Sequence, residues 1–111
     1  MDEAILHAAL LDSLEDPVLF ADCDHITRYM NAAAVAHYSE GRALIGRSLL
    51  DCHDEESNRM IHQVFEDLKS GATERLITDT EKWRIWMRAV RDPDGNLLGY
   101  YERYGPSKKG T

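Results

Sequence analysis

The chain has 111 residues, and its 13 Lys and Arg against 20 Asp and Glu give a formal net charge of −7. This length supports one hydrophobic core and one domain, and the acidic balance argues against nucleic acid or an anionic membrane as a partner, because both need a basic protein surface. Two cysteines are too few for a disulfide framework, and neither a signal peptide nor an apolar run of membrane-spanning length is visible, so we expect a cytoplasmic protein.

The chain is expected to begin with a helix over residues 2–14. Leu6, Leu10 and Leu14 recur there at helical spacing, and Pro17 follows shortly after, which disfavours continuation of the helix. The apolar face of this helix packs either on its own domain or on a second copy of the chain. In the second case the three leucines form a dimer interface.

The other predicted elements are strands and helices joined by turns. In chain order they are strands over 18–21 and 25–30, a helix over 32–38 after the cap Asn31, a loop-rich stretch over 44–50, a helix over 54–70 after the cap Asp54, and strands over 74–78, 83–90 and 97–104. Strands and helices that come in runs indicate an α+β fold with an antiparallel sheet. We therefore predict a five-stranded antiparallel sheet with helices across one face and an N-terminal flanking helix.

Alternation within the strands predicts which side chains share a sheet face. Arg28 and Met30 fall together in the second strand, and Arg84, Trp86 and Arg88 fall together in the fourth. An aromatic side chain among arginines on an outer sheet face is a candidate interface, so Trp86 joins the predicted dimer surface.

Three segments of the sequence resemble the PAS domain family. Residues 26–34 (ITRYMNAAA) are similar to the second strand and Asn-capped helix of that family, residues 44–50 (LIGRSLL) to the segment before its long helix, and residues 90–99 (VRDPDGNLLG) to the hairpin between its last two strands. The three segments occur in the family's order, and the resemblance covers residues 12–104.

One stretch looks closer to a particular PAS subgroup. Residues 46–71 are similar to PAS domains found beside hemerythrin-like domains, which typically read Cys-His-Pro where this chain has Cys52, His53 and Asp54. Together with the residue patterns, the resemblance divides the chain into an expected flanking helix over 1–15, a PAS domain over 16–104 and a disordered tail over 105–111.

The resemblance implies a sensory, non-enzymatic module. PAS domains bind a small molecule or cofactor between the sheet and the long helix, and they pass a change to a second copy or to a partner. Those partners are kinase, cyclase or DNA-binding outputs, of the kind used in bacterial two-component and cyclic-nucleotide signalling. We expect a homodimer, a small-molecule ligand and a signalling partner, with no nucleic acid or membrane bound directly.

The cofactor is left unknown by the sequence. The residues after Cys52 do not match the Asn-Cys-Arg-Phe-Leu-Gln type stretch of photoactive flavin domains, so flavin photochemistry is not expected. Covalent haem needs Cys-x-x-Cys-His, and Leu49 replaces its first Cys. Non-covalent haem remains open through His62 on the long helix or His53 before it. His62 lies about 100° from the apolar stripe, as a surface histidine does, and His53 equally suits a loop-end histidine bonded to a backbone carbonyl.

The expected ligand pocket draws on the inner sheet face and on the apolar stripe of the long helix. Its predicted lining is Phe20, Met30, His53, Ile61, Phe65, Ile85 and Met87. No residue is assigned to catalysis or to a metal. Two other hypotheses stay open: a ligand-free PAS domain used only for protein association, and a small enzyme in which His53 works with an acid.

Overall fold

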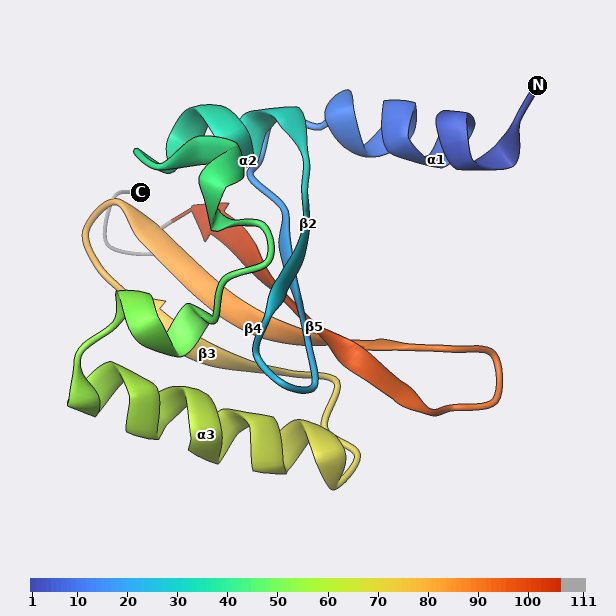
Figure 1. Cartoon of the computed structure of the whole chain (residues 1–111). Helices are drawn as coiled ribbons and strands as arrows, with labels where there is room; N and C mark the ends of the chain where they lie inside the picture. The colour runs from blue at the N-terminus through green and yellow to red at the C-terminus, as the bar shows by residue number, and fades with distance from the viewer. Residues whose placement is uncertain (107–111) are drawn as a thin grey trace.

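The computed structural model describes residues 1–106, apart from the side chain of Cys52. Its elements are α1 (Glu3–Asp12), β1 (Leu19–Asp22), β2 (Thr27–Met30), α2 (Ala32–His37), the 3-10 helices η1 (Gly41–Leu44) and η2 (Leu49–Cys52), α3 (Glu55–Lys69), β3 (Glu74–Asp79), β4 (Trp83–Arg91) and β5 (Leu97–Pro106). The five strands form one antiparallel sheet in the order β2-β1-β5-β4-β3 (Figure 1). The predicted α+β fold is confirmed.

One face of the sheet carries α2, η1, η2 and α3, and the hydrophobic core lies between these helices and the strands (Figure 1). The helical side contributes Ala34, Leu44, Leu49, Ile61, Val64, Phe65 and Leu68, and the sheet contributes Leu19, Ala21, Met30, Met87 and Tyr100. Helix α3 is the most regular contributor, because its apolar residues recur every three or four positions and therefore form one stripe. The side chain of Asp54 caps it by accepting a hydrogen bond from the Ser57 amide (2.8 Å).

Helix α1 stands apart from this core. It extends away from the sheet and the other helices (Figure 1), and none of its residues is buried. The predicted interface leucines are exposed by 40% at Leu6, 57% at Leu10 and 47% at Leu14. This helix therefore does not cover the sheet of its own domain. None of the helices in residues 1–106 combines the length and apolar character needed to cross a membrane.

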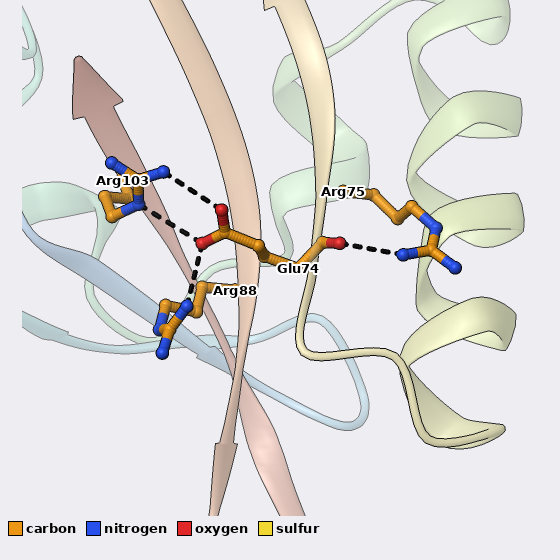
Figure 2. Close-up of polar contacts among 4 residues, drawn as sticks. All are labelled: Glu74, Arg75, Arg88 and Arg103. Carbon is orange, nitrogen blue, oxygen red and sulfur yellow. Dashed lines mark hydrogen bonds and ion pairs between the residues drawn. The ribbon is translucent and has the colours of Figure 1, made fainter.

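The other face of the sheet carries an arginine and aromatic cluster. Glu74 on β3 pairs with Arg88 on β4 (2.9 Å) and with Arg103 on β5 (3.0 Å), as Figure 2 shows. The guanidinium of Arg103 lies 4.0 Å from the centre of the Trp86 ring, and that of Arg84 lies 4.9 Å from it. Trp86 and its neighbouring arginines therefore lie on the same face of the sheet, as the alternation in the sequence predicted.

Two details of the strands differ from the prediction. A bulge in β2 places Thr27 and Met30 on the buried face and Arg28 on the exposed face, so Arg28 does not share a face with Met30. Strand β5 continues to Pro106, so the first two residues of the predicted tail belong to the sheet. The rest of that tail, residues 107–111, lies outside the described part of the chain.

Candidate functional site

A cavity of about 420 Å³ lies between the sheet and the segment that runs from α2 to η2. Its apolar wall comes from Leu19 on β1, Leu44 on η1 and Leu49 on η2. Its polar lining is Tyr38, Ser39, Glu40, Arg47, Asp51, His53 and Glu102. A concave, mainly preformed space with a few polar groups is the usual form of a small-molecule site.

A second cavity of about 250 Å³ lies between α3 and strands β3 and β4. Its lining is Ser57, Met60, Ile61, Ile77, Thr78 and Ile85, together with His53 and Glu102. Because the two cavities share His53 and Glu102, these residues stand at the junction of the two spaces.

Glu102 is the central polar residue of this site. It lies on the inner face of β5, and its Oε2 accepts a hydrogen bond from the Tyr38 hydroxyl (3.2 Å). The Tyr38 and Tyr104 hydroxyls lie 2.8 Å apart, and the Tyr104 hydroxyl also lies 3.5 Å from Glu102 Oε2, so the three side chains form one hydrogen-bonded cluster. Burial raises the pKa of Glu102 and outweighs the hydrogen bond from Tyr38, which lowers it. Burial and the carboxyl of Glu102 likewise raise the pKa of Tyr38.

His53 is the other group at the junction. Its Nδ1–H donates to the Leu49 carbonyl oxygen (2.7 Å), which accepts only, so the proton of the neutral ring is on Nδ1. The neutral ring therefore has its Nε2 available as an acceptor. This geometry matches the loop-end histidine bonded to a backbone carbonyl that the sequence left as one alternative.

The structure divides the seven predicted pocket residues into three groups. His53, Ile61 and Ile85 line the second cavity. The others that face inward are packed in the core and line neither cavity: Met30, Phe65 and Met87. The prediction that Phe20 lines the pocket is wrong. Its buried neighbours Leu19 and Ala21 lie on the inner face of β1, so Phe20 lies on the outer face.

The histidine suggested for haem lies elsewhere on α3. His62 is exposed and lines neither cavity, and its ring meets that of His25 edge-on at 5.2 Å. The predicted haem ligands His62 and His53 are therefore not brought together at one space. The side chain of Cys52 is outside the described part of the structure. Among the side chains that are described, no three His, Cys, Asp or Glu lie close enough to hold a metal ion.

His25 is a buried histidine that the sequence analysis did not identify. It occupies the turn after β1 with a positive φ of 65° and is only 7% exposed. Its Nδ1 lies 2.8 Å from the Tyr100 hydroxyl, and its ring packs on Phe65 at 4.9 Å. Burial lowers the pKa of His25, and the nearby His62 adds to this effect.

His25 should make the fold sensitive to mild acid. Because its pKa is lower in the folded state than in the unfolded chain, the stabilisation from neutral His25 is complete above about pH 6.5 and is lost as the pH falls through the folded pKa. His25→Asn keeps a residue that tolerates the positive φ and removes this titration. We expect urea unfolding of the wild type to weaken from pH 7 to pH 5 by more than that of the variant. Equal pH dependence in the two proteins would contradict this account.

The main residue missed in the sequence was Glu102. Strand β5 alternates Tyr100, Glu102 and Tyr104 on its inner face. A carboxylate at an inward position between two buried aromatic residues is itself a signal, since an unpaired buried charge is costly.

Comparisons with known proteins agree on one fold. A family model described as "PAS domain" matches residues 8–104. The C-terminal domain of a protein from Streptococcus mutans superposes with a TM-score of 0.77 at 23% identity, covering 95% of this chain and 85% of that one. The PAS domain of a protein from Colwellia psychrerythraea gives 0.69 at 12% identity, covering 97% of this chain and 99% of that one.

A third solved structure is a sensory box sensor histidine kinase from Vibrio cholerae. It superposes with a TM-score of 0.59 at 13% identity, covering 92% of this chain and 90% of that one. No curated protein matches the chain. At these levels of identity the structural neighbours establish the fold and not the ligand.

Proposed function

Because the chain belongs to the PAS domain family, we propose that it is a sensory domain that binds a small molecule in the cavity lined by Leu44, Leu49 and Glu102. PAS domains are generally sensory or interaction modules rather than enzymes. The observation that carries the proposal is the half-buried carboxyl group of Glu102 on the inner sheet face, where it borders both cavities. Among the described residues, Glu102 receives its hydroxyl contacts at Oε2, and its Oε1 remains available to accept a hydrogen bond from a ligand.

The fold also provides a route from the cavity to the N-terminal helix. The cavity is lined by Tyr38 at the end of α2, and Asn31 caps the other end of that helix. The side-chain amide of Asn31 donates to the Leu11 carbonyl in α1 (2.8 Å), and the Asp12 carboxylate accepts from the Ala32 amide (2.8 Å). A ligand that shifts α2 therefore acts on the base of α1, where a second copy or a signalling partner would respond.

A cavity-filling variant tests the ligand proposal. Leu44→Trp places a large side chain toward the cavity, and Leu98→Trp makes the same exchange at a leucine that is 47% exposed on β5. We expect compounds from a metabolite-sized library to raise the melting temperature of the wild type and of Leu98→Trp. We expect the same compounds to bind Leu44→Trp at least tenfold more weakly, because the space is occupied.

The alternative outcome identifies a different function. A library that stabilises none of the three proteins, or that stabilises Leu44→Trp as well as the wild type, would contradict the cavity proposal. It would favour the ligand-free interaction module, for which the half-buried aromatic and arginine cluster around Trp86 on the outer sheet face is the supporting observation.

We propose further that the domain forms a homodimer through α1. Leu6 and Leu10 on α1 and Leu14 just beyond its end are exposed in the described part of the chain, and exposed apolar side chains of this kind are typical of association surfaces. Sedimentation at tens of micromolar should report a dimer for the wild type and a monomer for Leu6→Glu with Leu10→Glu. A monomeric wild type, or a dimer that survives both substitutions, would contradict this interface.

A further inference from the structure

Among the charged residues that line the two cavities, carboxyl groups outnumber arginine and lysine. Arg47 Nη1 lies 3.4 Å from Glu40 Oε2, so the arginine of the larger cavity is paired within the rim. The carboxylates without an arginine or lysine beside them in the lining are Asp51 at the exposed edge and Glu102 on the inner wall. The second cavity adds no charged residue beyond His53 and Glu102. The ionised form of Glu102 would therefore be the one charge on the inner wall that no arginine or lysine of the lining balances.

The hydrogen-bonding groups at the junction of the two cavities also favour a positively charged ligand group. Oε2 of Glu102 is held by the Tyr38 hydroxyl, which keeps the carboxylate fixed and leaves Oε1 as an acceptor. His53 uses its Nδ1–H on the Leu49 carbonyl, so its neutral ring offers the Nε2 acceptor. Two acceptors that border one space suit a ligand group with several N–H donors and a positive charge.

The rest of the space is suited to an apolar body. The second cavity has Met60, Ile61, Ile77 and Ile85 around it, and these side chains offer no charged or strongly polar atom. A ligand that places its charged end at Glu102 can therefore bury a hydrocarbon or aryl part between α3 and the strands β3 and β4. Burial of that part removes apolar surface from water and therefore favours binding.

We infer that the site selects small protonated amines with an apolar body, in which the ammonium group binds between Glu102 and His53. This inference rests on the proposed function, since it names the ligand class of the same cavity. Groups facing Glu102 on the other elements are Tyr38 and His37 of α2, His53 after η2 and Tyr104 on its own strand. Burial raises the pKa of Glu102 more than the two hydroxyls lower it, and an ammonium ion supplies the counter-charge that the lining lacks, which lowers this pKa and favours the carboxylate–ammonium pair.

Three probes that share one body test the charge preference. The 2-phenylethylammonium ion, 2-phenylethanol and 3-phenylpropanoate are titrated separately into the full chain, and dissociation constants are read from shifts of backbone amide signals. We expect the amine to bind at least tenfold more tightly than the alcohol, because a charge-assisted hydrogen bond to the Glu102 carboxylate replaces a neutral one. The carboxylate probe should bind more weakly than the alcohol.

A matched pair of variants assigns the preference to one residue. Glu102→Gln keeps the shape and an acceptor for Tyr38 but removes the charge, and it should reduce the amine-to-alcohol ratio to within about threefold. Glu81→Gln makes the same change at an exposed position between β3 and β4 and should leave the ratio unchanged. The comparison among the three probes on the wild type stands even if Glu102→Gln does not fold.

The possible failures are distinguishable. If the alcohol or the carboxylate binds as tightly as the amine, or if Glu102→Gln keeps the preference, the amine inference is wrong while the cavity proposal stands. If compounds from the library bind at the cavity and none of them is an amine, the amine inference is again wrong and the cavity proposal again stands. If no compound of any charge binds at the cavity, the proposed function itself fails.

Discussion

Replacement of Asn31 by alanine should destabilise the domain by about 3–5 kcal/mol, because several buried hydrogen bonds are lost together. Asn31 is fully buried, and its Oδ1 accepts from the amides of Val18 (2.9 Å) and Ala34 (2.9 Å). Its Nδ2 donates to the carbonyls of Leu11 (2.8 Å) and Asp16 (3.1 Å). One side chain therefore joins α1, the start of β1 and the first turn of α2. Urea unfolding followed by circular dichroism measures the loss.

A matched asparagine separates this role from the general effect of the exchange. Asn96 is exposed in the turn between β4 and β5, where its side chain bonds only to Asp92 (3.1 Å). Asn96→Ala should cost less than about 1 kcal/mol. A similar small loss for Asn31→Ala would show that water replaces the buried contacts, and it would remove Asn31 from the proposed link between the cavity and α1.

Replacement of Gly99 by alanine should cost at least about 3 kcal/mol or prevent folding, because another strand passes too close for a side chain. A Cβ atom at Gly99 would lie 2.1 Å from the Ala21 carbonyl oxygen, 2.7 Å from a ring carbon of Phe20 and 2.9 Å from the Asp22 Cα. Gly99 lies where β5 pairs with both β1 and β4, so backbone movement there would disturb three strands. Thermal unfolding of the purified variant measures the effect.

Gly95 provides the control for this prediction. Its φ is +87°, yet a Cβ atom there would have no neighbour within 4 Å. Gly95→Ala therefore reports backbone strain alone and should cost about 1–2 kcal/mol. If Gly99→Ala is no worse than Gly95→Ala, the close approach of β1 to β5 is not as the structure has it.

Much of the fold was predictable because local signals agreed with the tertiary structure. Helix α3 has its stripe of apolar residues and its cap Asp54, and it was predicted within one residue at each end. The turn before β5 follows from the Asp-Pro-Asp-Gly sequence, where Asp92 accepts from the amides of Asp94 and Asn96 (both 2.9 Å). Signals of this kind lie within a few residues and need no knowledge of the rest of the chain.

The parts that failed depend on contacts between distant segments. The run from Val18 to Ala21 is apolar throughout, so alternation could not show that Phe20 faces outward. The bulge in β2 shifts Thr27 inward and depends on its pairing with β1. The site at Glu102 combines a residue of β5 with Tyr38 at the end of α2, which lies 64 residues earlier in the sequence. No local pattern contains that pairing.

The proposed ligand site is tested most directly by mapping a bound compound onto the chain. The tightest-binding compound of the library is titrated into the ¹⁵N-labelled wild type, and the shifts of the backbone amides are assigned. We predict that the largest shifts fall on Leu49, His53 and Glu102, which border the two cavities. Largest shifts on α1 or on the outer face around Trp86, with these three amides unchanged, would contradict the central claim that the cavity holds the ligand.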